Sequence, residues 1–303
     1  MELRDIEIFL TLAEELHFGR TAERLHVTPA RVSKAIKKQE RVLGVELFER
    51  SSRQVNLTEA GRRLAEQLAP AVRQIREALA GASATGHGLT GVLRVGWAAA
   101  WTAKLALKAG DRFMERHPGC EVELYEVPLH DRFGGLRAHE LDVQITELPA
   151  YEPDIAVSPV IFREPRALLV PADHPLARRE FVTLEDYAEV PLITITGPPA
   201  YFLDYHLPHY TPSGRPNQRG PATVAWQEVL SLVGAGKGAC PTAVRAGEFY
   251  GRSDVVFVPV RDAPTIDWAL QWLSDGENLM VRDFVEVLLE EAADPVWRSA
   301  IPG

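Results

Sequence analysis

A turn followed by a strongly patterned helix near the N-terminus limits most sharply how this chain of 303 residues can fold. Thr28 can cap a helix, and Pro29 suits its first turn, where the backbone N–H would have no partner. Val32 and Ile36 then recur at helical spacing and predict one buried face. The opposite face carries several basic side chains. This arrangement predicts a helix-turn-helix whose second helix presents its charged face to DNA phosphates and base edges.

The charged face of this helix predicts two kinds of DNA contact. Side chains at its start, chiefly Ser33 and Lys34, are placed to reach base edges in the major groove. Basic side chains further along are placed to hold the helix on phosphates. The residues expected to bind DNA are Pro29, Ala30, Arg31, Ser33, Lys34, Lys37, Lys38, Arg50 and Arg53.

The net charge of −9 opposes a nucleic-acid partner at first sight, but the charge is unevenly distributed. Residues 20–53 contain nine Lys or Arg and four Asp or Glu, whereas the whole chain contains 33 and 42. A basic segment on an acidic body suits local attachment to DNA. A solvated helix face would also account for the charge, but the turn and the capping pattern favour DNA.

The surrounding pattern predicts a winged form of this motif, followed by a long helix. Residues 3–16 carry the apolar stripe of a first helix, and residues 46–50 and 54–57 alternate like the strands of a hairpin. Thr58 can cap the next helix. An apolar stripe along that helix predicts packing against a second copy, with packing inside the same chain as the alternative. The stripe consists of Leu64, Leu68, Val72, Ile75 and Leu79.

Small and polar residues from Gly81 to Gly88 predict a hinge, and the pattern changes beyond it. Strand and helix segments then alternate, which is typical of an α/β domain. Strands are expected at 92–96, 120–127, 143–146, 155–162, 166–171, 192–196 and 255–260. Helices are expected at 102–117, 133–141, 183–188, 224–235 and 282–292.

An ordered series of short motifs runs through the first 60 residues. It comprises Ala22-x-x-Leu25-x-x-Thr28-Pro29-x-x-Val32-Ser33-x-x-Ile36, Leu43-Gly44, Leu47-Phe48-x-Arg50 and Leu57-Thr58-x-Ala60-Gly61. Together with the long helix that follows, these motifs resemble the LysR-type transcriptional regulators. Weaker matches extend the resemblance through the rest of the chain, including Leu93–Gly96 and Pro118-Gly119.

The resemblance implies a chain that is α/β overall, with an N-terminal winged helix-turn-helix, a long linker helix and a two-lobed α/β effector domain resembling periplasmic solute-binding proteins. The expected bounds are 1–58 for the DNA-binding domain, 59–82 for the linker and dimerisation helix, 83–91 for a hinge and 92–303 for the effector-binding domain. Lobe I is expected at about 92–160 and 268–303, and lobe II at about 161–267. The resemblance also implies a homodimer or homotetramer on double-stranded DNA, with Arg53 of the wing in a minor groove.

The chain departs from the family pattern where a ligand would bind. Members commonly place Ser or Thr near Ala99 and Ala100, where their hydroxyl groups hold a ligand carboxylate at a helix N-terminus. Backbone N–H groups and Thr102 remain to receive an anion there. Because the side-chain donors are absent, a small carboxylate effector is less expected here than in a typical member of the family. Departures in the recognition unit that leave the fold intact are Gly19, Thr21 and Gln39.

A cleft between two α/β lobes is where ligands usually bind. The expected effector-binding residues are Ala99, Ala100, Trp101, Thr102, Thr146, Thr194, Thr196, Thr223 and Trp226. Aromatic residues gather near these segments and suit an apolar or aromatic effector: Trp97, Trp101, Tyr201, Phe202, Tyr205 and Trp226. Packing in the core is the alternative role for Trp101 and Trp226.

Other patterns in the chain predict no chemistry. Gly234–Gly238 lacks the spacing of a phosphate-binding loop and is expected to end a helix. Asp and His residues around Pro208 are not expected to bind a metal, because the proline interrupts the helical register between them. Cys120 and Cys240 are expected to be packed thiols.

These observations favour a DNA-binding transcriptional regulator whose C-terminal domain senses a small molecule. We expect no enzyme activity, cofactor, metal or membrane partner, and a cytoplasmic location, because catalytic motifs, long apolar runs and a secretory signal are missing from the sequence. One alternative is a regulator of the same kind that has no small-molecule effector and answers to a protein partner or to its assembly state. Another is a solute-binding or enzymatic domain with a helix-turn-helix appendage.

Overall fold

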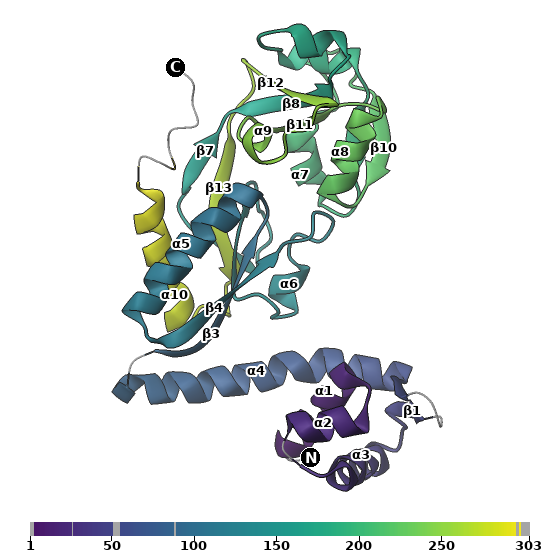
Figure 1. The fold of residues 1–303 in the computed structure, drawn as a ribbon, viewed down its shortest axis with the longest axis vertical. Helices are drawn as coiled ribbons and strands as arrows, with labels where there is room; N and C mark the ends of the chain where they lie inside the picture. The colour runs from purple at the N-terminus through teal and green to yellow at the C-terminus, as the bar shows by residue number, and fades with distance from the viewer. Residues whose placement is uncertain (1–2, 26, 51–54, 88, 295–296, 298–303) are drawn as a thin grey trace. The chain divides into compact units, whose positions relative to one another are not determined.

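The computed structural model describes residues 3–25, 27–50, 55–87, 89–294 and 297, and it divides into two compact units, Met1–His87 and Gly88–Gly303 (Figure 1). Each unit has a hydrophobic core of its own. None of the helices in these residues combines the length and the apolar character that a membrane span requires.

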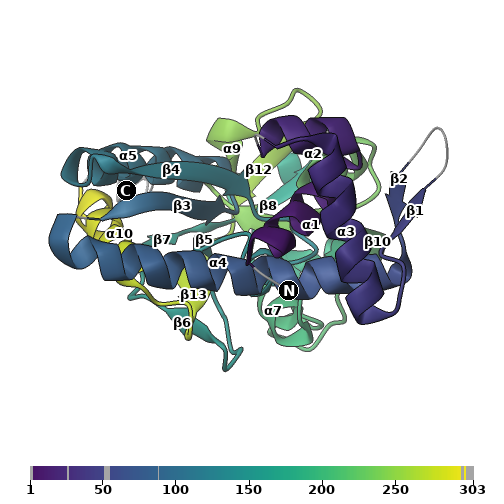
Figure 2. The same cartoon turned by 90° about the horizontal axis from the view of Figure 1, so that it is seen from below.

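Three short helices, a two-stranded hairpin and one long helix make up the first unit (Figure 2). They are α1 (Leu3–Glu15), α2 (Phe18–Arg24), α3 (Pro29–Leu43), β1 (Phe48–Arg50), β2 (Val55–Leu57) and α4 (Glu59–His87). Thr28 caps α3 as expected, because its Oγ1 accepts a hydrogen bond from the N–H of Arg31 at 3.3 Å. Gly44 ends α3 with φ of 73°, a left-handed conformation that glycine adopts without strain.

The core of the first unit joins α1, α3 and the hairpin to the beginning of α4. Phe9 of α1 packs edge-on against Phe48 of β1, with ring centroids 5.7 Å apart. Leu64 and Leu68 of α4 pack against the same core. The first part of the apolar stripe therefore packs inside its own chain, which is the alternative to the predicted dimer contact. Further along the helix, Ile75 is 45% exposed.

Helix α4 is longer than the sequence pattern predicts. It continues to His87, so residues 83–87 are helical although the sequence predicts a hinge there, and the predicted end of the linker helix at residue 82 is too early. Gly81 and Gly86 each cost about 1 kcal/mol relative to alanine in a helix. The alanines between them favour helix, and extending an existing helix adds a hydrogen bond for each residue. The gain from extending α4 therefore exceeds the tendency of these small residues to form a flexible hinge.

A close backbone contact joins the start of α4 to the hairpin. Thr58 Oγ1 accepts a hydrogen bond from the N–H of Gly61 at 2.9 Å and donates one to the carbonyl of Glu46 at 2.8 Å. A Cβ atom on Gly61 would lie 2.1 Å from the carbonyl oxygen of Leu47. Only glycine allows the two backbones to approach so closely.

Lobe I of the second unit is built on a six-stranded sheet with strand order β4-β3-β5-β13-β6, and β7 also pairs with β13. The strands are β3 (Thr90–Trp97), β4 (Gly119–Glu126), β5 (Val143–Glu147), β6 (Ile155–Val157), β7 (Phe162–Glu164) and β13 (Ile266–Leu273). The helices are α5 (Ala100–Arg116), α6 (Gly134–Arg137) and α10 (Leu279–Ala292). Phe113 of α5 packs against Phe284 of α10, with ring centroids 5.7 Å apart.

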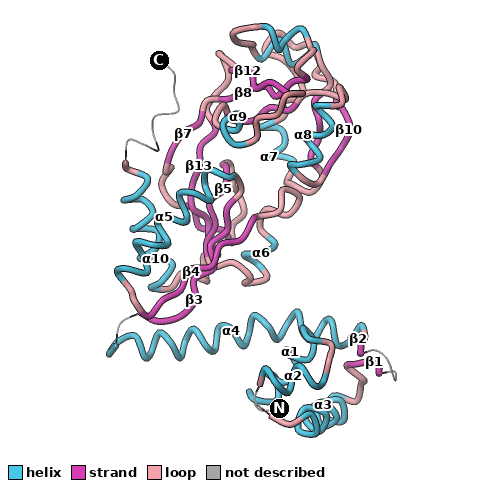
Figure 3. Tube along the Cα trace, in the orientation of Figure 1, coloured by secondary structure: helices cyan, strands magenta, loops and turns pink. Residues whose placement is uncertain are grey.

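Lobe II contains a three-stranded sheet with order β11-β8-β12 and a parallel pair of strands, β9 and β10 (Figure 3). Its strands are β8 (Arg166–Pro171), β9 (Leu192–Ile195), β10 (Arg219–Thr223), β11 (Cys240–Ala243) and β12 (Val255–Pro259). Its helices are α7 (Ala200–His206), α8 (Trp226–Gly234) and α9 (Ala246–Phe249), with 3-10 turns at Pro175–Arg178 and Leu184–Glu189. The architecture agrees with the predicted α/β fold of an N-terminal helix-turn-helix and a two-lobed domain.

The chain crosses between the lobes near residue 165 and again between residues 259 and 266. Strand β7, predicted to lie in lobe II, pairs with β13 in the sheet of lobe I. The predicted strand at 155–162 is two strands, with Pro159 in the break between them. The sequence also failed to predict β13, which lies at the centre of lobe I and has six buried residues among eight, so it lacks a simple alternation of apolar and polar residues.

Replacing Gly61 with alanine tests the contact at the start of α4. We expect Gly61→Ala to lower the free energy of unfolding by about 1–3 kcal/mol, because the new methyl group must displace the Leu47 carbonyl. Chemical denaturation followed by circular dichroism measures the effect. Glu66→Ala, at an exposed site of the same helix, is the control. Equal stability of the two variants would contradict a tight junction.

Candidate DNA-recognition helix and interlobe cavity

Helix α3 separates a buried apolar face from an exposed basic face. Val32, Ala35, Ile36 and Gln39 are buried against the rest of the first unit. The Nε2 atom of Gln39 donates a hydrogen bond to the carbonyl of Asp5 at 2.7 Å, so this departure from the family pattern fixes α3 to α1. The burial leaves the basic side chains on the outer face.

The expected DNA-binding residues that the structure describes gather on this outer face. The residues exposed on it are Pro29, Ala30, Arg31, Lys34, Lys37 and Lys38, and Ser33 is half-buried. Lys38 was expected to contact phosphate, but its Nζ lies 2.9 Å from Asp5 Oδ2. The side chain of Arg50 and all of Arg53 lie outside the described residues.

Basic side chains of the preceding helix are paired with carboxylates, so unpaired positive charge remains chiefly on α3. Arg20 and Arg24 of the preceding helix pair with the carboxylate of Glu15, each at 3.1 Å. Hydrogen bonds from Arg24 and Arg20 lower the pKa of Glu15, so it remains ionised beside them. Within the described residues, no ion pair engages Lys34 or Lys37. These two lysines therefore retain their charge for an external anion.

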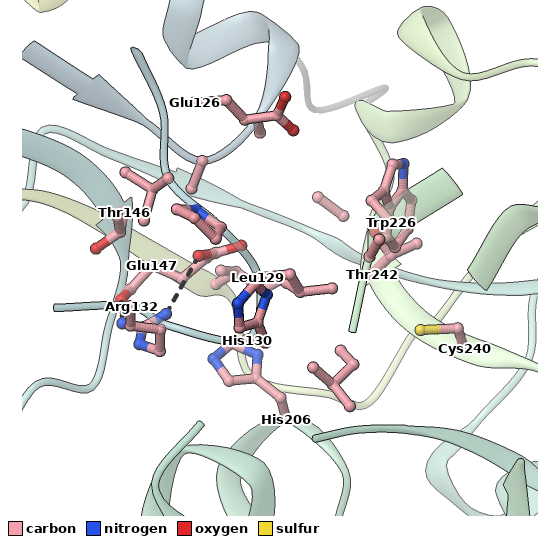
Figure 4. Close-up of a pocket in the computed structure, with 18 of the residues that line it drawn as sticks. Glu126, Leu129, His130, Arg132, Thr146, Glu147, His206, Trp226, Cys240 and Thr242 are labelled. Carbon is pink, nitrogen blue, oxygen red and sulfur yellow. Dashed lines mark hydrogen bonds and ion pairs between the residues drawn. The ribbon is translucent and has the colours of Figure 1, made fainter. Parts of the chain in front are cut away.

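A cavity of about 580 Å³ lies between the two lobes of the second unit, within the roughly 300–1,000 Å³ range of ligand pockets. Lobe I contributes the ends of β3, β4 and β5, and lobe II contributes parts of α7, α8 and β11. Figure 4 shows Thr146, Glu147 and Arg132 on one side of the view, and Trp226, Thr242 and Cys240 on the other. Aromatic residues form much of the lining: Trp97, Trp101, Phe202, Trp226, Tyr250 and Trp268.

Five of the nine expected effector-binding residues line this cavity: Ala99, Ala100, Trp101, Thr146 and Trp226. The remaining four do not line it. Thr102 is buried in the first turn of α5, and Thr223 donates to the carboxylate of Glu228. Thr194 and Thr196 lie in β9 and just after it, outside the lining.

The N-terminus of α5 uses the N–H groups of Ala99, Ala100 and Thr102 within the protein. The N–H of Ala99 donates to Thr102 Oγ1 at 3.1 Å, and this hydroxyl donates back to the carbonyl of Ala99 at 2.8 Å. The N–H of Ala100 donates to the hydroxyl of Tyr250 at 3.1 Å. The expectation that Thr102 and neighbouring backbone N–H groups remain to receive an anion is therefore wrong for Thr102 and for these two N–H groups.

Sequence reasoning missed a buried ion pair in the cavity wall. Arg132 donates to the backbone carbonyl of Glu147 at 2.7 Å, and its Nη1 lies 3.5 Å from Glu147 Oε2. Burial lowers the pKa of Arg132 and raises the pKa of Glu147, and each charge partly offsets the effect on the other. Glu147 directly follows the expected Thr146 at the end of β5. Ligand sites lie at the carboxyl ends of parallel strands, so the position of Glu147 could have predicted its place in the cavity wall.

His206 closes the lower part of the cavity in Figure 4 as a neutral imidazole. Burial and the charge of Arg166 hold the pKa of His206 well below its ordinary value. Its Nδ1 accepts a hydrogen bond from Arg166 at 3.3 Å, and its Nε2 donates to the carbonyl of Leu148 at 3.1 Å. Both ring nitrogens are thus occupied. Among the described residues, no cluster of three or more His, Cys, Asp or Glu is arranged to hold a metal ion.

The two cysteines are buried, free thiols on different sheets. Cys120 lies on β4, and Cys240 lies on β11 in the cavity wall. Burial raises the pKa of Cys240 to about 12 and also raises the pKa of Cys120. Because the thiolate is the reactive form, both groups are poor nucleophiles at neutral pH.

Two family models match the chain. Residues 3–62 match the bacterial regulatory helix-turn-helix protein of the lysR family, and residues 86–293 match the LysR substrate binding domain. The chain belongs to the LysR family of transcriptional regulators. It is a DNA-binding regulator with an effector-binding domain, and membership confirms the expectation that it is not an enzyme.

Relatives and solved structures of this family resemble the regulator over most of its length. It is 28% identical to the HTH-type transcriptional regulator AlsR of Bacillus subtilis over 290 residues, 95% of each chain. It is 33% identical to the dual regulator OxyR of Escherichia coli over 195 residues, 64% of each chain. Full-length CbnR in complex with its target DNA superimposes with a TM-score of 0.67 at 21% identity, covering 96% of this chain and all of that chain.

Replacing Lys34 tests the recognition face of the regulator. We expect Lys34→Ala to weaken binding to a selected operator by about 1–3 kcal/mol and to relax base preference at one position. Titration of labelled duplexes, with the operator and with random sequence, measures both effects. Lys104→Ala removes an exposed lysine from the second unit and serves as the control. If Lys34→Ala lowers the affinity for operator and for random DNA equally, Lys34 contacts only phosphate.

Proposed function

We propose that the regulator binds operator DNA through the exposed face of α3 and senses a small, largely apolar or aromatic molecule in the interlobe cavity. The observation that carries this proposal is the cavity itself, which has the volume of a ligand pocket and an aromatic lining. Arg31, Ser33, Lys34 and Lys37 are the proposed contacts of α3, with Arg50 and Arg53 on the wing. The proposed site of action is the cytoplasm.

We infer that two or four copies act together. One recognition helix reads a short stretch of a major groove, and a symmetric pair reads two half-sites about one helical turn apart. The exposed Ile75 on α4 supports a contact between copies beyond the part of the helix that its own unit covers. Sedimentation of the full chain, alone and with a duplex carrying both half-sites, tests this assembly.

Contacts between the lobes support a cavity that closes around its ligand. The ring of Tyr151 packs on that of Tyr201 with centroids 4.7 Å apart, and Arg132 lies 3.7 Å from the ring centroid of Phe202. Gly197 of lobe II has φ of 112°, and a Cβ there would lie 2.0 Å from the carbonyl oxygen of His130 in lobe I. Closure therefore requires the absence of a side chain at residue 197.

A panel of metabolites in a thermal-shift experiment separates the proposed sensor from a regulator without a small-molecule effector. Stabilisation by one chemical class supports sensing, since a ligand that binds only the folded state raises Tm. Silence across apolar and aromatic compounds favours control by a protein partner or by assembly.

Replacing Gly197 tests closure directly. We expect Gly197→Ala to abolish most of the ligand-induced rise in Tm, because the methyl group cannot fit beside His130 in the closed arrangement. Gly214→Ala is the control: it has a similar positive φ of 87° and no atom within 4 Å of the added Cβ. A full ligand response in Gly197→Ala would contradict closure at this contact.

Peroxide sensing is a second candidate because several relatives are named hydrogen peroxide-inducible genes activators. The buried thiols argue against it here, since burial raises the pKa of Cys240 to about 12. We expect no disulfide and no oxidised thiol after brief treatment of the folded protein with stoichiometric peroxide, as measured by intact mass. Unfolded protein treated in the same way is the positive control. A mass change in the folded protein that Cys240→Ser removes would support peroxide sensing.

A further inference from the structure

The geometry points to an organic cation as the effector: an aromatic molecule that carries an ammonium group. This inference rests on the proposed function and specifies the ligand of the same cavity. Two carboxylates and a set of partly exposed aromatic rings carry it, together with a helix N-terminus where the N–H groups of Ala99 and Ala100 are already used.

The charged residues that line the cavity are more acidic than basic. They are Glu126, Glu147 and Arg132, while the two lining histidines are His130 and His206. His206 is neutral because burial and Arg166 depress its pKa. The described lining contains no lysine or aspartate. The lining therefore offers two carboxyl groups and one guanidinium, and the guanidinium is already paired with Glu147.

Glu147 rather than Arg132 faces the cavity. The side chain of Glu147 is 24% exposed although it lies deep between the lobes, whereas that of Arg132 is 5% exposed. Figure 4 draws the Glu147 carboxylate among the side chains that surround the cavity. Arg132 is held in the wall by the backbone carbonyl of Glu147 and by the ring of Phe202, whose centroid is 3.7 Å from its guanidinium carbon. The cavity thus presents the carboxylate of this ion pair to a ligand.

Tyr250 joins the cavity lining to the N-terminus of α5. Its hydroxyl accepts the N–H of Ala100, and the charges of both Glu126 and Glu147 raise its pKa in addition to the effect of burial. Glu126 and Glu147 line the same cavity as Tyr250. In this cavity a ligand carboxylate would face two glutamates and two backbone N–H groups that are already used, whereas an ammonium group would face two carboxyl groups.

The aromatic lining suits the same cation. Trp97, Trp226 and Tyr250 are partly exposed and line the cavity together with the glutamates. The face of an aromatic ring attracts a cation within about 6 Å of its centroid, most strongly when the cation is shielded from water. Aromatic rings beside carboxylates bind both the apolar body and the charged end of an aryl-alkyl ammonium.

Three indoles of nearly equal size test the charge of the effector: tryptamine (ammonium), tryptophol (neutral) and indole-3-propionate (carboxylate). Isothermal titration of each into the full chain at neutral pH measures affinity. We expect tryptamine to bind at least about tenfold more tightly than tryptophol, which corresponds to about 1.4 kcal/mol, and indole-3-propionate to bind most weakly. If tryptophol or indole-3-propionate binds as tightly as tryptamine or more tightly, the inference of a cationic effector is wrong, while the proposed sensing of a small molecule still stands.

Variants of the two glutamates identify the source of the preference. We expect Glu126→Gln and Glu147→Gln each to lower tryptamine affinity at least about fivefold while tryptophol affinity stays within about twofold, because only the charge contact is lost. Glu121→Gln, an exposed glutamate of the same strand as Glu126 that does not line the cavity, is the control.

The exposed Glu126 keeps the test decisive if Glu147→Gln fails to fold after losing the charge opposite Arg132. Unchanged tryptamine binding in Glu126→Gln, or equal losses for tryptamine and tryptophol, overturns the assignment of the ammonium to these carboxylates. Absence of binding by all three indoles overturns the cation inference as well, and the proposed sensing function is then judged by the metabolite panel alone.

Discussion

The double crossing of the chain between the two lobes is the constraint on which the ligand site depends. Because the backbone passes from lobe I to lobe II near residue 165 and returns before β13, the lobes are joined along one side. The ends of β3, β4 and β5 consequently lie opposite α7, α8 and β11 across the cavity. Residues as distant in sequence as Ala100 and Tyr250 thereby become hydrogen-bond partners.

That arrangement explains how this chain departs from a site for small carboxylates. Alanines stand at positions 99 and 100, Thr102 turns inward to complete the cap, and Tyr250 takes a backbone donor. The N–H groups of Ala99 and Ala100 at the start of α5 are thus used within the protein, and the carboxyl groups in the cavity lining are those of Glu126 and Glu147. In the proposed site, a few side chains around one helix start would set the class of ligand without altering the fold.

The sequence predicted best what depends on local spacing. The cap at Thr28, the proline that follows it and the buried face of α3 each arise within a few residues, so the start of this helix lies where the sequence predicts it. Strand β13 and the ion pair of Arg132 with Glu147 depend on contacts between distant segments. Lys38 shows the same limit, since its pairing with Asp5 follows from how α1 and α3 pack.

Thr58 and Gly61 have a mechanical consequence for the recognition unit. The first turn of α4 lies against the backbone of Leu47, and Leu64 and Leu68 pack on the same core as α3. These contacts join the beginning of α4 firmly to α3. A rotation of the beginning of α4 would therefore move α3 with it. A signal that reorients α4 in two copies would therefore change the distance between their α3 helices on DNA.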